Sequence, residues 1–179
     1  HIPAPSWDTF RRLFAERAVV QFTATPFRRD GKHVDGKIIY SYPLRKAQAE
    51  QYFKPITFIP IQEYHPKRTD EKIARAAVGQ LRADLARGLN HLIMARADTV
   101  ERAGQIHAIY QLIADDYHPV LLHSRQGAAA RREGLQRLRG GASRIVVCVA
   151  MLGEGFDLPQ LKIAALHDIH KSLAITLQF

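Results

Sequence analysis

The stretch RIVVCVAMLGEGFDLPQL, residues 144–161, decides how this sequence folds. Residues 145–150 are an unbroken apolar run, which is typical of a strand buried on both faces of a parallel sheet. The run ends abruptly in a segment that contains two glycines, two carboxylates and a nearby proline. Glycines allow a ligand to approach the backbone closely, because they have no side chain. The stretch therefore predicts a buried strand whose carboxyl end opens onto a binding site.

Strands and helices alternate on both sides of this stretch. Apolar runs predict strands at residues 18–25, 56–64, 91–96, 119–124, 144–150 and 161–169. Amphipathic spacing predicts helices at residues 4–17, 69–88, 99–116 and 128–141. We expect Ser6 to cap the first helix, Thr69 or Asp70 to cap the second, and Gly88 to end it. The alternation predicts an α/β fold with a parallel sheet and helices on both faces, preceded by a domain boundary near residue 51.

Length and composition limit the class of protein. The 179 residues, 46% of them hydrophobic, suffice for one ordinary domain or for one domain and part of another. No apolar run approaches the roughly 18 to 20 residues of a membrane span, and the N-terminus lacks the layout of a signal peptide. We therefore expect a soluble, cytoplasmic protein that does not associate with membranes. The single cysteine, Cys148, lies in the apolar run and is interpreted as a buried structural thiol.

The charge balance favours a partner that carries phosphates. The sequence has 26 Lys and Arg against 17 Asp and Glu, a formal net charge of +9 and a pI near 10.0. Clustered positive charge produces a field that scattered charge does not. The clusters are Arg28, Arg29 and Lys32, and then Arg125, Arg131, Arg132, Arg137, Arg139 and Arg144. The alternative is that the excess of arginine only keeps the protein soluble.

Polar residues follow the predicted strands. In parallel sheets ligands bind at the carboxyl ends of the strands, so these positions are where binding chemistry is expected. They hold Thr23 and Thr25, Arg96, the triplet His123-Ser124-Arg125, and the loop that begins at Met151.

Five segments in order resemble the motifs of superfamily 2 helicases of the DEAD/DEAH-box type, close to the helicase subunits of bacterial restriction-type enzymes. Thr23-Ala24-Thr25-Pro26 followed by FRRDG resembles motif III, and HLIMARADTVERAGQIHAIY resembles motif IV. VLLHSRQGAAARREGLQRLRGG is similar to the segment that follows motif IV. VCVAMLGEGFDLPQL resembles motif V, and HKSLAITLQF resembles the approach to motif VI.

The resemblance implies an ATP-dependent helicase or translocase with RecA-like domains. Residues 1–50 would be the C-terminal part of the first domain with a linker, and residues 51–179 the second domain. The implied cofactors are ATP and Mg²⁺, and the implied partner is nucleic acid, with DNA preferred, RNA open, and further subunits or domains in the intact enzyme. No G-x-x-x-x-G-K-[ST] phosphate loop occurs in the sequence. We expect that loop, the magnesium-binding box and the arginine fingers of motif VI to lie outside these residues, and the residues alone to be inactive.

The same resemblance implies a role for each candidate residue. Thr23 and Thr25 would couple the two domains across the cleft, where their hydroxyls can form hydrogen bonds. Gly155, Asp157 and Gln178 would face the nucleotide, with Asp157 accepting hydrogen bonds from ribose hydroxyls. The residues that would contact the nucleic-acid strand are Arg96, His123, Ser124, Arg125 and Gly153. The alternatives are a turn-capping role for Asp157, a surface salt bridge for Arg96 and a structural role for His123.

Two other functions and a metal site are alternatives that the same sequence raises. A non-catalytic nucleic-acid-binding or interaction module would also explain the basic charge, and the fold would suit a Rossmann-type enzyme, although G-x-G-x-x-G is absent after the first strand. His167, Asp168 and His170 have the residue types of a metal site. We expect a strand to send His167 and Asp168 to opposite faces, so the sequence predicts no metal site.

Overall fold

The computed structural model describes residues 5–22, 37–52, 54–149 and 158–168, without the side chains of 5–8, 66 and 67. The chain divides between Phe58 and Ile59 into two compact units. The predicted domain boundary near residue 51 stays a prediction. Within the described part of the chain, no helix combines the length and the hydrophobicity that crossing a bilayer requires.

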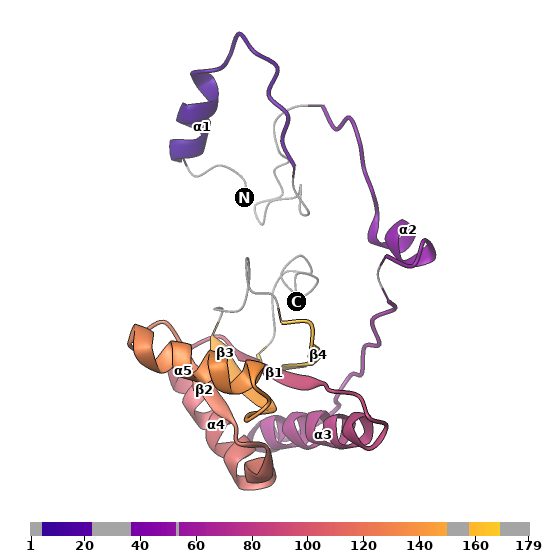
Figure 1. Ribbon diagram of the computed structural model, residues 1–179, viewed down its shortest axis with the longest axis vertical. Coiled ribbons are helices and arrows are strands. Elements are labelled where there is room, and N and C mark those ends of the chain that lie inside the picture. Colours follow the sequence, from indigo (N-terminus) through magenta and orange to yellow (C-terminus); the bar gives the residue numbers. More distant parts are fainter. Residues whose placement is uncertain (1–4, 23–36, 53, 150–157, 169–179) are drawn as a thin grey trace. The chain divides into compact units, whose positions relative to one another are not determined.

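The first unit contains two short helices. Helix α1 is Pro5–Arg12 and helix α2 is Leu44–Ala49 (Figure 1). The helix predicted at residues 4–17 is therefore confirmed, although it ends earlier.

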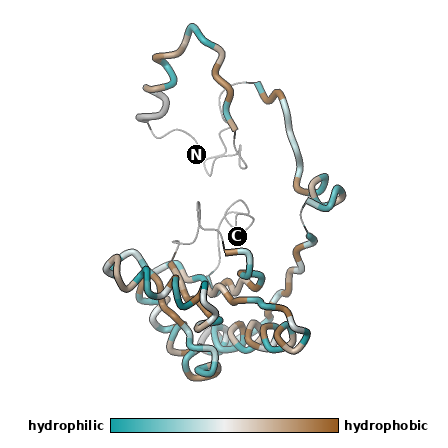
Figure 2. Tube along the Cα trace, viewed as in Figure 1, coloured by the Kyte–Doolittle hydropathy of each residue, from teal (hydrophilic) through white to brown (hydrophobic). Residues whose placement is uncertain are grey.

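Two predicted strands are wrong. Residues 18–22 and 56–64 are neither helix nor strand, and their hydrophobic side chains other than Ile61 are exposed; Phe22 is 93% and Phe58 75% exposed. Figure 2 shows such hydrophobic residues in brown on extended chain outside the helices. A strand needs a neighbouring strand to bond its N–H and C=O groups, and the described residues supply none for these two segments. High β propensity alone does not create a strand.

The second unit is a parallel four-stranded sheet in the order β2-β3-β1-β4. Its strands are β1 Leu92–Ala97, β2 Val120–Leu122, β3 Ile145–Val149 and β4 Leu161–Leu166. The helices that alternate with them are α3 Pro66–Ala86, α4 Val100–Ala114 with the short η1 Asp115–Tyr117, and α5 Ala128–Arg139. The predicted α/β class and the parallel sheet are confirmed.

The two faces of the sheet carry separate hydrophobic clusters. Helices α3 and α4 cover one face, where Ala74, Leu81, Ile106 and Tyr110 pack against strand residues such as Ile93. Helix α5 covers the other face, where Leu138 packs with residues such as Val146 and Cys148. The central strand β1 is buried over its whole length, as a strand between two helical layers must be. Burial also raises the pKa of the Cys148 thiol to about 12, which agrees with a structural role for this residue.

Strand β4 contains one irregularity in its pairing with β1. Leu92 pairs with Leu161 but Ile93 pairs with Ile163, so Lys162 is an extra residue. A bulge of this kind shifts all later side chains by one face. Ile163 and Ala165 consequently join the cluster under α3 and α4.

The predicted helix caps are confirmed in part, since Ser6, which we expected to cap α1, lies inside that helix, which includes Pro5. Thr99 caps α4 by accepting a hydrogen bond from the backbone N–H of Arg102 at 3.1 Å. Gly88, with φ of +77°, follows α3 as predicted. The cap expected at Thr69 or Asp70 is wrong, because α3 begins earlier, at Pro66, a residue suited to a first helical turn.

Helix α5 lies very close to β2 at one position. A Cβ atom on Gly134 would come within 2.7 Å of Leu122 Cδ2, and Leu122 is buried. Glycine therefore permits the close approach of this helix to the sheet.

Candidate functional site

The carboxyl ends of the parallel strands meet at one edge of the sheet. Residues 98–99 follow β1, residues 123–127 follow β2, and residues 167–168 follow β4. Because ligands of open α/β sheets bind at this edge, it is the candidate site. The described residues there fall into two groups, the loop after β2 and a polar network beside β1 and β4.

The loop after β2 is braced from within by one side chain. Gln126 donates a hydrogen bond to the Leu121 carbonyl at 2.9 Å and accepts one from the backbone N–H of His123 at 3.0 Å. Ser124 and Arg125 are exposed, whereas His123 is half-buried. His123 Nδ1 is buried and has no hydrogen-bond partner among the described residues. The loop thus presents a hydroxyl and a guanidinium outward from a firm base.

Arg125 already has a carboxylate partner. Its guanidinium lies 2.7 Å from Glu101, in the first turn of α4, and the side chains are 68% and 65% exposed. Exposed ion pairs of this kind contribute little free energy. A phosphate can therefore replace Glu101 at small cost.

Arg96 occupies a different environment from the other predicted contact residues. It lies in β1 opposite Cys148 and Leu166 and is only 7% exposed. Arg96 therefore does not lie at the surface, and the alternative of a salt bridge stays a prediction. A contact between Arg96 and nucleic acid stays a prediction.

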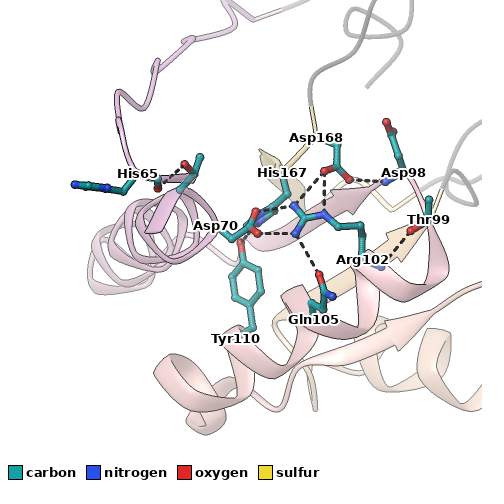
Figure 3. A network of polar contacts seen from close by, with 10 residues as sticks. His65, Asp70, Asp98, Thr99, Arg102, Gln105, Tyr110, His167 and Asp168 are labelled. Carbon is teal, nitrogen blue, oxygen red and sulfur yellow. Dashed lines mark hydrogen bonds and ion pairs between the residues drawn. The ribbon is translucent and has the colours of Figure 1, made fainter. Parts of the chain in front are cut away.

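A network of charged side chains joins α3, α4 and the residues after β4 (Figure 3). The Arg102 guanidinium donates to Asp70 at 2.7 and 3.0 Å and to Asp168 at 3.1 and 3.2 Å. His167 Nδ1 lies 3.0 Å from Asp70, and His167 Nε2 lies 3.3 Å from the Tyr110 hydroxyl. Asp168 also accepts a hydrogen bond from the backbone N–H of Asp98 at 2.7 Å. Four separate elements are tied together by this network.

The network changes the pKa values of its members. Burial of Asp70 opposes its ionisation, but hydrogen bonds from Arg102 and His167 outweigh that effect and lower its pKa. Burial of His167 disfavours its protonation and lowers its pKa, although Asp70 acts in the opposite direction. The hydrogen bonds that Arg102 donates to Asp70 and Asp168 raise its pKa, so this residue is always charged.

Sequence reasoning missed this network. We expected a strand to separate His167 from Asp168, but β4 ends at Leu166 and both side chains join the same network, His167 through Asp70 and Asp168 through Arg102. The available signal was the placement of Asp70 and Arg102 near the starts of two helices that flank the same sheet edge. No group of three or more His, Cys, Asp or Glu that could hold a metal ion occurs in the described ranges.

The arginine cluster of residues 125–144 is divided by the fold. Helix α5 has 12 residues and therefore spans about 18 Å between opposite edges of the sheet. Arg125, Arg131 and Arg132 lie toward its first end, at the candidate site. Arg139 and Arg144 lie toward the other end, where Arg144 donates a hydrogen bond to Asn90. Neighbours in sequence thus do not form one surface patch.

Six predicted site residues lie outside the described residues. They are Thr23, Thr25, Gly153, Gly155, Asp157 and Gln178. Their roles stay predictions.

Comparisons with known proteins show the family. Residues 81–179 match the helicase conserved C-terminal domain. UvrABC system protein B of Chlorobaculum tepidum is 29% identical over 125 residues, which are 68% of this chain and 17% of that protein. The chain therefore spans about a sixth of the length of that relative.

Two solved structures resemble the fold. The C-terminal domain of the DEAD-box protein Dbp5 has a TM-score of 0.44 and 14% identity over 60% of this chain and 54% of its own. The same domain of S. cerevisiae Dbp5 bound to Gle1 and IP6 has a TM-score of 0.41 and 16% identity, with 58% and 56% covered. Both TM-scores lie below 0.5, so these likenesses add nothing to the sequence match. That match covers more than half of the chain, which therefore belongs to the superfamily 2 helicases and carries their conserved C-terminal domain.

Proposed function

We propose that the protein is an ATP-dependent nucleic-acid helicase or translocase, with DNA as its preferred substrate and RNA as the other candidate. The observation that carries this proposal is the match of residues 81–179 to the helicase conserved C-terminal domain. The proposal places the protein in the cytoplasm, with ATP and Mg²⁺ as cofactors.

The loop after β2 supports binding to a phosphate backbone. Ser124 and Arg125 are exposed at the carboxyl edge of the sheet, directly before the N-terminus of α5. That helix has no acidic residue in its first turn, and Arg131 and Arg132 follow closely. Hydroxyl groups, guanidinium groups and helix N-termini are the usual donors to phosphate oxygens, and they carry little base specificity.

The proposed reaction requires groups from two RecA-like domains. ATP lies between them, water attacks the terminal phosphoanhydride bond in line, and positioned charges stabilise the transition state. In this scheme Asp157, Gly155 and Gln178 face the nucleotide, while Thr23 and Thr25 couple its state to domain closure. Closing and reopening of the cleft moves the strand past the contacts made by Arg125 and its neighbours.

The test uses the full-length protein with single-stranded DNA, single-stranded RNA and duplexes with single-stranded overhangs. We expect ATP hydrolysis that depends on Mg²⁺ and rises with nucleic acid, together with strand separation. The variant Asp157→Ala should lose stimulated hydrolysis while its melting temperature stays near that of the wild type. If Asp157→Ala melts much earlier but hydrolyses ATP normally while folded, the residue is a structural turn residue.

The same assay separates the rival module. A protein that binds nucleic acid in a salt-dependent manner but hydrolyses no ATP would be a non-catalytic binding module, and the proposed helicase activity would be wrong.

A further inference from the structure

The Arg102 network is more elaborate than packing alone requires. Partly buried ion pairs contribute little net stability, because the loss of hydration offsets much of their attraction, and apolar residues often stabilise the same space equally well. Here one guanidinium, two carboxylates and a buried histidine occupy a boundary between helices that is otherwise hydrophobic. Such groups also fix the orientation of the side chains that they join, since each hydrogen bond has a preferred angle.

The guanidinium of Arg102 is fully engaged. Nη1 donates to Asp70 and, at 3.4 Å, to Gln105; Nη2 donates to Asp70 and Asp168; and Nε donates to Asp168. These bonds account for the five N–H donors that an arginine has. Arg102 therefore has no donor left for a phosphate, and it must act through the residues that it holds.

Asp168 is the residue that Arg102 holds at the end of β4. One carboxylate oxygen of Asp168 accepts from Arg102, and the other accepts from the backbone N–H of Asp98 at 2.7 Å. The preceding residue, His167, extends the ladder through its backbone N–H to the Arg96 carbonyl at 3.1 Å and binds Asp70 through its ring. The direction in which the chain leaves the sheet is thus set immediately before residue 169.

We propose that Arg102 and Asp168 are positioning residues for nucleotide turnover. Their pairing holds Asp168, which precedes Gln178 in the sequence by ten positions, against the N-terminus of α4 and the loop after β1. Arg102 joins this start to α3 through Asp70, so the exit of the chain from β4 is held by two helices and a loop. This inference rests on the proposed helicase function.

The test measures kcat, the KM for ATP and the melting temperature of the full-length protein with saturating single-stranded DNA. The variants are Arg102→Lys, which keeps the charge but cannot hold two carboxylates in a plane, and Asp168→Asn, which keeps the shape but loses the charge. The matched control is Arg75→Lys, because Arg75 pairs with Glu71 on the exposed surface of α3 at 2.7 Å. We expect kcat to fall about tenfold to a hundredfold in both variants, with a smaller change in KM, since a small displacement of reacting groups slows turnover strongly. The control should match the wild type.

The double variant sharpens this result. If Arg102 acts through Asp168, Arg102→Lys with Asp168→Asn should lose no more kcat than the more impaired single variant. Folded variants with the kcat of the control would overturn the positioning role, as would losses that simply multiply. If Arg102→Lys fails to fold, Asp168→Asn alone decides between these outcomes. A wild-type protein that hydrolyses no ATP would overturn the proposed function, and the positioning role with it.

Discussion

Arg102 and Arg125 begin from similar positions and end in different roles. Each is an arginine at the carboxyl edge of the sheet with a carboxylate at 2.7 Å. The Arg102 side chain is 34% exposed and contacts two carboxylates that are 16% and 19% exposed. The Arg125 side chain is 68% exposed and contacts one carboxylate, Glu101, which is exposed as well. A hydrogen-bond distance therefore does not reveal what an arginine does; the number of partners and their burial do.

We call the Arg102 pairs fixed, because their partners are partly buried, and the Arg125 pair exchangeable, because a ligand can replace its exposed partner Glu101. Water and salt screen an exposed pair, so a ligand can replace one of its members. A partly buried group with several partners loses more when one of them is removed. We therefore assign architecture and positioning to Arg102, and recognition to Arg125.

We expect the largest effect when the partly buried ion pair of Arg102 and Asp70 is broken. Asp70→Ala leaves His167 without its Nδ1 partner and Arg102 with one carboxylate, so we expect a loss of about 2 to 4 kcal/mol in the free energy of unfolding. Glu101→Ala removes the exposed carboxylate and should cost below about 1 kcal/mol. Urea unfolding of the two variants measures both values. Equal losses would show that the two pairs do not differ.

A glycine in α4, which carries Arg102, and a glycine in α5, which follows the Arg125 loop, allow a second comparison. Gly134→Ala in α5 forces a Cβ atom against the buried Leu122, and we expect it to destabilise the fold by about 1 to 2 kcal/mol. Gly104→Ala in α4 meets nothing within 4 Å and should stabilise the helix by up to about 1 kcal/mol. Thermal unfolding distinguishes the two signs. Stabilisation by both substitutions would mean that α5 can shift, and that the base of the Arg125 loop is not firm.

A third experiment uses pH to probe the fixed network. The pKa of His167 is lower in the folded protein than its ordinary value, so between about pH 6.5 and the folded value the unfolded chain binds more protons. Stability should therefore fall as the pH falls through this window, by at most about 1.4 kcal/mol per pH unit from this residue. The lowered pKa of Asp70 adds a further loss only below about pH 4.

His167→Gln isolates that contribution. The variant lacks the titrating ring, so its stability should depend less steeply on pH between 7 and 5, as measured by urea unfolding at several pH values. Parallel curves for variant and wild type would show that His167 titrates alike in the folded and unfolded chain.

The smallest expected effect concerns the exchangeable pair. Glu101→Gln frees Arg125, so binding to mixed-sequence single-stranded DNA should strengthen by up to about fivefold at low salt, the value of one exposed ion pair. Arg125→Ala should weaken binding to all sequences alike and reduce the slope of log affinity against log salt by about 0.7. Fluorescence anisotropy over a salt series measures both. If Glu101→Gln does not strengthen DNA binding, a ligand does not replace Glu101 readily, and the Arg125 ion pair resembles the pairs of Arg102.

The sequence predicted the sheet better than its surroundings. The strands near residues 91–96, 119–124, 144–150 and 161–169 were found because apolar runs between helices leave few other packing solutions. The strands predicted at 18–25 and 56–64 were wrong over their described residues, because apolar β-branched and aromatic residues also occur in chain that has no neighbouring strand. The local sequence pattern of a segment does not show whether a neighbouring strand is present to pair with it.

The candidate site was predictable only in part. The rule that ligands bind at carboxyl ends of parallel strands directs attention to His123, Ser124 and Arg125, and the structure places them in one loop at that edge. The pairing of Asp70 with His167 joins residues 97 positions apart, and no spacing rule reaches that far. Whether an arginine is exchangeable also depends on burial, which follows from tertiary packing.

The extra residue in β4 determines which side chains of the strand face α3 and α4. Because side chains alternate along a strand, the residue at Lys162 decides whether odd or even positions beyond it point toward α3 and α4. With the bulge, the odd series of Ile163, Ala165 and His167 faces these helices, and a buried imidazole arrives beside Asp70. Without it, the even series of Ala164 and Leu166 would face them, and His167 would turn away from Asp70. The exposed Lys162 thus sets the phase of the strand, because this one extra residue decides whether the imidazole five residues downstream meets its carboxylate partner.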